Sequence, residues 1–330
     1  MLSRFTDPGE HAALLDVLPH DPLAICAVAS RQTIHQNLLP SFGIARAAWP
    51  GMRRVWPPRL DDLLAAPHEL PPHTLSGARR PENRIVGACV LESHFLAGLL
   101  RHRGFEVRIR VGYFANIRAD RELIVRFWED VMREKRVEPE LLDRDPERWR
   151  QVVNAYTERK NELDHRIEHW VCEYWDGSEA RWTLIDANDA FLRYHSGLEV
   201  GFFPPPRYFE HAHDAWLRLR TDGSIDPDRY AEEPQDGRSH IRSQLLSDFF
   251  SLLNHDVAGV DEPESADYAF LKRRSFDDLG DHELEALDAL ATLLSREPSA
   301  EELLEFYRAT PVLRLSSAEG DPYSLVYSRR

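Results

Sequence analysis

Three residues of reactive type lie in two short segments of this chain. Cys89 falls where a loop leads into an apolar stretch, in RIVGACVLESHFLAGLLRHRG, and His169 and Asp186 fall in the later segment EHWVCEYWDGSEARWTLIDAN. A thiol, an imidazole and a carboxylate are the parts of a nucleophilic acyl-transfer site, in which a thiolate attacks a carbonyl and the histidine moves the proton. The sequence therefore predicts a cysteine enzyme that acts on an amide, an ester or a thioester.

The segment around Cys89 has the pattern of a helix followed by a strand. Apolar residues recur at four-residue spacing and Gly104 stands where a left-handed residue ends a helix, so a helix is predicted over about residues 88–103. Cys89 then lies in the first turn, where the helix dipole favours a thiolate. The alternation in FEVRIRVGYF (105–114) predicts a strand with one buried face.

The second segment predicts a β-hairpin. DGSE offers a two-residue type II′ turn at Gly177 and Ser178, and such a turn fixes the register of the two strands. In this register His169 faces Asp186 directly, with Cβ atoms about 5 Å apart, so the carboxylate can hold the imidazole N–H. Cys172 points to the opposite face of the hairpin and is expected to pack in the core.

An oxyanion formed by attack of Cys89 needs two hydrogen-bond donors. The N–H of Cys89, which follows the uncrowded backbone of Gly87, is one candidate. The second donor is expected from an upstream side chain. Gln32, Gln36 and Trp56 are candidates by residue type alone.

The chain divides into three predicted parts that together give an α+β fold. Residues 1–83 have helical periodicity followed by many prolines, which predicts a helical and proline-rich N-terminal layer. Residues 84–225 carry the core with the three candidate catalytic residues, and mixed charges with helical periodicity predict a helical insertion at 116–168. Residues 226–330 predict a helical C-terminal extension, in which Ser299 begins a capping-box pattern.

Composition limits the classes of partner and compartment. The chain has 330 residues and a formal net charge of -15, so repulsion from phosphate backbones argues against a nucleic-acid partner. Its three cysteines are few, odd in number and far apart, which argues against disulfides and predicts a reducing, cytoplasmic location. The sequence has neither the pattern of an export signal nor an apolar stretch of membrane-spanning length, so no membrane partner is expected. The oligomeric state stays open.

The order and wording of these segments resemble the transglutaminase-like superfamily, which has a papain-related fold. RIVGACVLESHFLAGLLRHRGFEVRIRVGYF is similar to the cysteine helix and first core strand of that family, and EHWVCEYWDGSEARWTLIDAN is similar to its histidine and aspartate hairpin. The resemblance implies an antiparallel sheet packed on a cysteine-bearing helix. It implies Cys89 as the nucleophile, His169 as the base and Asp186 as the orienting carboxylate.

The wider chain resembles a set of bacterial transglutaminase-like proteins of mostly unassigned activity, with two departures. VLESH after the nucleophile lacks the Arg-Asp pair expected in that set, and the insertion at 116–168 separates strands that are normally closer in sequence. The expected partners are an acyl donor, which is a peptide, a protein or a small metabolite, and an amine or water as acceptor. A covalent mechanism of this kind needs no cofactor.

Two other functions stay open at the level of the sequence. The first is a catalytically silent transglutaminase-like domain that serves as a scaffold for a protein partner. The second is a metallohydrolase, because His165, Glu168 and His169 spell H-x-x-E-H, a zinc-protease signature. That signature needs both histidines on one face of a helix, whereas the residues after His169 have the pattern of a strand.

Overall fold

The structure is a computed structural model of the chain. It describes residues 3, 5–39, 42–44, 59–65, 75, 77–115, 165–196, 201–230, 236–254 and 275–313. Of the predicted insertion at 116–168, only residues 165–168 are among these, and Trp56 lies outside the described residues.

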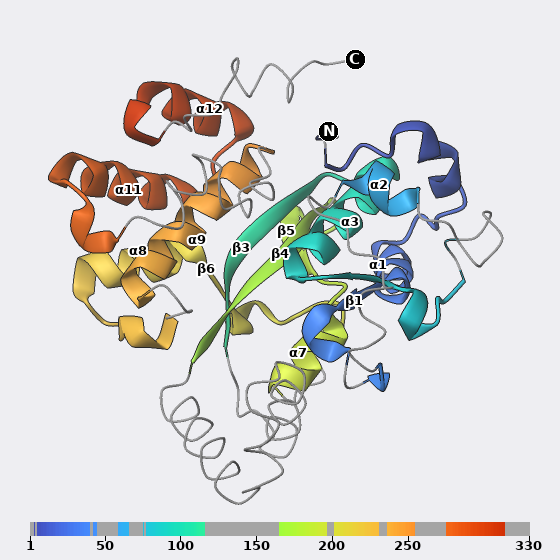
Figure 1. Ribbon diagram of the computed structural model, residues 1–330. Helices are drawn as coiled ribbons and strands as arrows, with labels where there is room; N and C mark the ends of the chain where they lie inside the picture. The colour runs from blue at the N-terminus through green and yellow to red at the C-terminus, as the bar shows by residue number, and fades with distance from the viewer. Residues whose placement is uncertain are drawn as a thin grey trace, which may run out of the picture.

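A four-stranded antiparallel sheet stands at the centre of the molecule (Figure 1). Its strands, in spatial order, are β5 (Arg181–Ile185), β4 (Arg166–Asp176), β3 (Val107–Ala115) and β6 (Phe209–His211). A separate pair of short parallel strands consists of β1 (Thr33–His35) and β2 (Ile85–Gly87). Helices lie on both sides of the sheet, so the predicted combination of helices and an antiparallel sheet is confirmed.

The N-terminal helices pack on one side of the sheet (Figure 1). They are a 3-10 helix (Gly9–Leu15), α1 (Pro22–Gln32), α2 (Leu60–Leu64) and α3 (Cys89–His102). α1 begins after Asp21, whose side chain accepts a hydrogen bond of 2.8 Å from the N–H of Ala24. α3 is buried on all sides from Cys89 to Arg101 and forms a core with β3 and β4. Gly104 follows α3 with a φ of 87°, as predicted for the residue that ends this helix.

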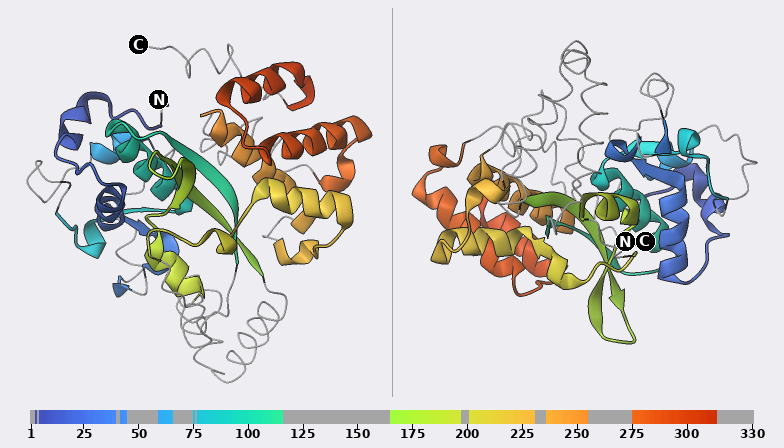
Figure 2. Two further views of the ribbon diagram at one scale, coloured as in Figure 1. Left: turned by 180° about the vertical axis from the view of Figure 1, so that it is seen from behind. Right: turned by 90° about the horizontal axis from the view of Figure 1, so that it is seen from below.

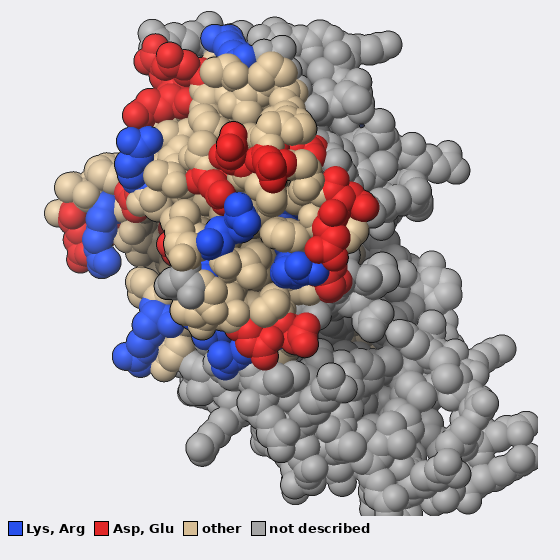
Figure 3. Space-filling model, turned by 90° about the vertical axis from the view of Figure 1, so that its left-hand side faces the viewer, with Lys and Arg blue, Asp and Glu red and all other residues tan. Residues whose placement is uncertain are grey.

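The C-terminal helices pack on the other side, as the two views of Figure 2 show. They are α8 (Ala212–Leu217), its π-helical continuation (Arg218–Asp222), α9 (Gly237–Leu252), α11 (Asp281–Leu294) and α12 (Ala300–Ala309). Tyr113 of β3 belongs to their core, which ties them to the sheet. Ser299 caps α12 in the predicted capping box with Glu302. The outer surface of these helices carries intermixed acidic and basic side chains (Figure 3).

Short elements complete the described chain. Two of them lie near reactive side chains and were not predicted. These two are β6 and α7 (Asp189–Ser196). The others are 3-10 helices over Gln36–Leu38, Pro81–Asn83, Pro206–Tyr208, Pro227–Tyr230, Phe276–Asp278 and Pro311–Leu313. Within the described part of the chain, no helix has the length and apolar character that crossing a membrane requires.

The polar face of β3 is buried, which corrects the prediction of a strand with a single buried face. Arg110 donates to both carboxylate oxygens of Asp248 on α9, at 3.0 and 2.9 Å, and to Glu173 on β4 at 3.3 Å. Arg108 donates to the same Glu173 carboxylate at 2.6 Å. Burial disfavours charged carboxylates, but Arg110 outweighs it and holds the pKa of Asp248 and of Glu173 well below the usual range. The alternation along β3 is therefore real, but its polar residues form a buried ion network.

The turn between β4 and β5 differs from the predicted two-residue turn. The loop is Gly177–Ala180, and Asp176 pairs with Arg181 across its base. The strands are therefore offset by two positions from the predicted register. An even offset leaves each side chain on its predicted face, because side chains alternate along a strand with a period of two. The expectation that His169 directly faces Asp186 is wrong, whereas their placement on one face of the hairpin is right.

Candidate active site

Cys89 is the first residue of α3, as the sequence predicts. The residue before it, Ala88, has an extended backbone and caps the helix without a side-chain hydrogen bond, so the N–H groups of the first turn are not covered by a capping side chain. The carbonyl of Ala88 accepts from the N–H of Leu91 at 3.0 Å and of Glu92 at 3.3 Å, which closes the first turn. The Cys89 residue is 9 % exposed, so the sulfur sits at the edge of the core and not in open solvent.

Strand β2 delivers the chain to Cys89 in a fixed position. It pairs with β1 in parallel register, with His35 beside Gly87, so an upstream segment of the chain lies next to the start of α3. Gly87 is required sterically, because a Cβ at this position would lie 2.6 Å from Cδ1 of Leu91. Strand β1 was not predicted, although the apolar Ile34 between two polar residues is a weak strand pattern.

His169 on β4 is bonded to Asp186, which follows the last residue of β5. The Nε2 atom of His169 lies 2.5 Å from Oδ2 of Asp186, and both side chains are almost completely buried. The other carboxylate oxygen of Asp186 accepts from the N–H of Asn188 at 2.8 Å, so the carboxylate cannot rotate freely. The ring of His169 is stacked on Phe191 of α7, and Phe114 packs against it edge-on. These contacts fix the plane of the imidazole.

The remaining ring nitrogen of His169 is Nδ1, and Cys89 lies near this ring. Nδ1 is buried without a hydrogen-bond partner of its own, and the Cys89 thiol interacts closely enough with the ring to affect its pKa. Burial alone would lower the pKa of His169, but the Asp186 carboxylate and, to a smaller extent, Cys89 raise it to about 10. His169 is therefore an imidazolium at neutral pH. The structure brings Cys89, His169 and Asp186 together.

Glu92, which the sequence analysis did not single out for chemistry, is part of the same group. It lies three positions after Cys89 on α3, and the i, i+3 spacing that places it on the same helix face was visible in the sequence. Burial and the nearby Asp186 raise the pKa of Glu92 to about 8, with Thr33 and His169 acting in the opposite direction. Glu92 is therefore mainly a neutral carboxylic acid at pH 7.

Of the candidate oxyanion donors, Gln32 is buried and bonded to a loop, whereas Gln36 is exposed near the start of α3. Gln32 is buried in the last turn of α1, and its amide nitrogen donates to the carbonyl oxygens of Leu75 and Gly77, at 2.9 and 2.7 Å. These two bonds engage the donor atom of Gln32 with a loop. Gln36 is exposed and directly follows His35, the residue that pairs with Gly87. Its backbone therefore lies close to the start of α3.

Cys172 points away from the face of His169, as predicted. It is fully buried, and its thiol donates to the carbonyl oxygen of Ser93 on α3 at 3.2 Å. Burial raises the pKa of Cys172 well above that of an ordinary thiol. Cys172 therefore helps to pack the sheet on α3 and is an unreactive thiol. Cys26 of α1 is also fully buried, with its pKa raised by burial.

The H-x-x-E-H segment does not have the helical geometry that its zinc-protease pattern requires. Residues 166–169 are part of β4, so Glu168 and His169 project to opposite faces of a strand. Glu168 accepts hydrogen bonds from His240 and Gln244 of α9, both at 2.9 Å, whereas His169 bonds to Asp186. Glu168 therefore links the sheet to α9 and does not share a site with His169.

Comparison of the chain with protein-family models, with curated proteins and with solved structures finds no match. The geometry of Cys89, His169 and Asp186 is therefore the basis for a proposed function.

Proposed function

We propose that this chain is a cysteine-dependent acyltransferase or hydrolase with a papain-like, transglutaminase-like core, which works through an acyl-enzyme on Cys89. The observation that carries the proposal is the orientation of His169. Its Nε2 is held by the buried Asp186 carboxylate, and its Nδ1 is left for the thiol. A thiol, imidazole and carboxylate in this order are what nucleophilic acyl transfer needs.

Electrostatics around the sulfur favour an anionic nucleophile. The imidazolium of His169 puts a positive charge beside Cys89, and the N-terminus of α3 adds the positive end of a helix dipole. Glu92 is close to this group but mainly neutral at pH 7, so it adds little opposing charge. These contributions stabilise the negative charge that the Cys89 sulfur carries when it attacks the acyl carbon.

The reaction has two halves that exchange one proton through His169. In the first half the Cys89 sulfur bonds to the acyl carbon, the bond to the leaving amine, alcohol or thiol breaks, and the imidazolium gives that leaving group its proton. In the second half, neutral His169 takes a proton from water or an amine as its oxygen or nitrogen attacks the thioester. The thiolate then leaves and the thiolate–imidazolium pair is restored. The N–H of Cys89 is a donor for the oxyanion in both halves.

The arrangement of the elements supports a papain-like type of core. A cysteine at the start of a central helix packs against an antiparallel sheet, and adjacent strands of that sheet supply the histidine and the aspartate. This is the arrangement that the resemblance of the two sequence segments implies. The fold thus supports the same mechanism as the side-chain geometry does.

One observation favours a second candidate function, a catalytically silent scaffold. Cys89 is only 9 % exposed, so a substrate carbonyl can reach the sulfur only where neighbouring side chains yield. A scaffold would keep this thiol closed, whereas an enzyme must open it to substrate.

Alkylation by iodoacetamide at neutral pH, followed by peptide mass analysis, distinguishes the two functions. Cys26 and Cys172 are internal controls, because both are fully buried thiols with raised pKa values. The enzyme proposal predicts rapid and selective modification of Cys89 in the folded chain. Modification of Cys89 no faster than of the two control cysteines would support the scaffold instead.

A further inference from the structure

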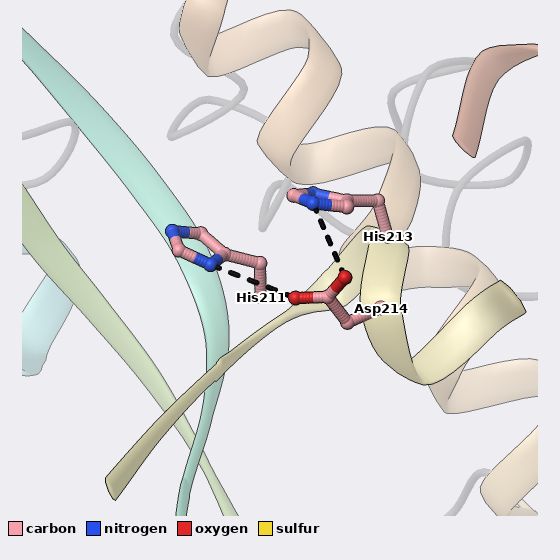
Figure 4. A group of neighbouring side chains, drawn as sticks. All are labelled: His211, His213 and Asp214. Carbon is pink, nitrogen blue, oxygen red and sulfur yellow. Dashed lines mark ion pairs between the residues drawn. The ribbon is translucent and has the colours of Figure 1, made fainter. Parts of the chain in front are cut away.

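Two histidines and an aspartate converge where β6 runs into α8, at a site separate from the residues of the proposed reaction (Figure 4). His211 is the last residue of β6, and His213 and Asp214 lie in the first turn of α8. In Figure 4 dashed lines join one nitrogen of each ring to the Asp214 carboxylate. Among the residues that the structure describes, this is the group of three possible metal ligands whose ligand atoms all lie within 4.8 Å of one another.

The spacing of these atoms is close to that of a metal site. Nδ1 of His211 lies 3.8 Å from Oδ2 of Asp214, and Nε2 of His213 lies 3.5 Å from Oδ1 of the same carboxylate. Ligand atoms at about 2.0–2.1 Å from a tetrahedral zinc ion are about 3.3 Å apart. The two measured distances, which end on different oxygens of Asp214, are a few tenths of an ångström longer, and the three ligand atoms as a set lie within 4.8 Å of one another. The Asp214 side chain is 49 % exposed and can rotate to close the difference.

The second nitrogen of each ring has a carboxylate near it. Nε2 of His211 lies 3.2 Å from Oε1 of Glu173, and Nδ1 of His213 lies 3.9 Å from Oδ2 of Asp248. Metal-bound histidines usually donate their other N–H to a carboxylate, which fixes the ring and its tautomer. Arg110 donates to Nδ1 of His213 at 3.3 Å, so zinc binding through Nε2 requires this ring to change tautomer and to donate its Nδ1–H to Asp248. Arg110 also holds Glu173 and Asp248 in place and so keeps both carboxylates behind the rings.

Charge and access also fit a cation. Three carboxylates, those of Glu173, Asp214 and Asp248, share this region with the guanidinium groups of Arg108 and Arg110, which leaves one net negative charge when the histidines are neutral. The rings are largely buried while Asp214 faces solvent, so an ion would enter from the side of the aspartate.

We propose that His211, His213 and Asp214 bind one Zn²⁺ ion per chain, with water as the fourth ligand. Two imidazole nitrogens, one carboxylate oxygen and an open position form a common zinc coordination set. The ion ties the end of β6 to α8 and, through the carboxylates behind the rings, to β4 and α9. This site is independent of the proposed acyl transfer at Cys89.

The test is calorimetric titration of the full chain with zinc chloride, with thermal unfolding measured in the presence and absence of the metal. One zinc ion per chain and a rise in melting temperature of at least about 3 °C are expected, because the metal binds the folded state. Asp214→Asn should remove this binding and the rise. Asp214 is half exposed, so the variant keeps its fold, and its melting temperature without metal checks this. Magnesium chloride should give neither effect.

Two controls make the test specific. Asp16→Asn should bind zinc as the native chain does, because Asp16 is an exposed carboxylate that pairs with a single histidine, His102, at 3.3 Å. Cys89→Ala should also keep the site, which separates it from any zinc bound by the Cys89 thiol. The absence of a zinc site in the native chain, or a site that persists in both Asp214→Asn and His211→Ala, would overturn the proposal.

Discussion

Asp186→Asn tests the link between the buried carboxylate and the reactivity of Cys89. Asparagine has nearly the same shape, so the carbonyl oxygen can still accept from the Asn188 N–H. The amide nitrogen then faces Nε2 of His169, where the native chain has a hydrogen bond of 2.5 Å to a carboxylate. The ring must accept this hydrogen bond, so its own hydrogen moves to Nδ1. His169 is left in the tautomer that cannot accept a proton from the acceptor water or amine.

The size of the effect follows from the pKa of His169. In the native chain Asp186 raises it to about 10, so the ring is almost fully protonated at about pH 7.5. Without that charge, burial dominates and the pKa falls below the ordinary value of 6.5, which leaves less than about one-tenth of the rings protonated. The loss of the imidazolium alone costs about tenfold, and the wrong tautomer extends the loss in turnover towards about 10⁴-fold.

The assay is the rate of Cys89 alkylation between pH 6 and pH 9, measured by mass analysis of the Cys89 peptide. We expect the Asp186→Asn rate to be at least about tenfold lower than the native rate near neutral pH, because the variant lacks the positive charge beside Cys89, and this difference to become smaller as the pH rises. Asp176→Asn is the matched control, because Asp176 lies at the exposed end of the same hairpin. Equal pH profiles for native chain and Asp186→Asn would refute the thiolate–imidazolium argument.

Three further predictions concern stability. Gly87→Ala should lower the free energy of unfolding by about 1–3 kcal/mol, because its Cβ would lie 2.6 Å from Leu91, whereas Gly177→Ala, with nothing within 4 Å, should change thermal unfolding little. The raised pKa of Glu92 means that between pH 4.5 and about 8 the folded state holds a proton that the unfolded state releases, so the free energy of unfolding falls as pH rises. Glu92→Gln should reduce this fall when chemical unfolding is measured across that range. An unchanged dependence of the free energy of unfolding on pH would contradict the prediction. Arg110→Met should cost about 3–5 kcal/mol in urea unfolding, because the buried Asp248 carboxylate loses its guanidinium partner and Glu173 keeps only Arg108 of its two arginines. A cost no larger than that of exposed Arg193→Met would contradict the ion network.

Local sequence patterns predicted the elements that carry the candidate site. The apolar spacing after Cys89 and the position of Gly104 predicted α3 to within a residue or two, because helix periodicity and left-handed glycine caps are local properties. The strand pattern around His169 was also local, and it correctly argued against a helix for H-x-x-E-H. The offset of the hairpin register was not predictable from DGSE, which fits both a two-residue turn and the observed four-residue loop.

Features that depend on contacts between distant segments were missed. The alternation of Arg108 and Arg110 with apolar residues predicts a solvated face in isolation. Burial of that face becomes favourable only through Glu173 and Asp248, which lie far away in the sequence. Strand β1 has three residues and is stabilised by pairing with β2, about fifty positions away. The raised pKa of Glu92 likewise follows from burial and from Asp186.

Trapping an acyl group on Cys89 tests the proposed acyl-enzyme directly. The native chain is incubated with p-nitrophenyl acetate, an activated ester, quenched in acid, and its cysteine peptides are analysed by mass. The acyl-enzyme mechanism predicts one acetyl group on Cys89, which hydroxylamine removes as it does from a thioester. The group should be absent from Cys26 and Cys172 and should form much more slowly in Asp186→Asn. An unmodified Cys89 in a folded chain, or equal acetylation of Cys89 in native and Asp186→Asn chains, would contradict this mechanism.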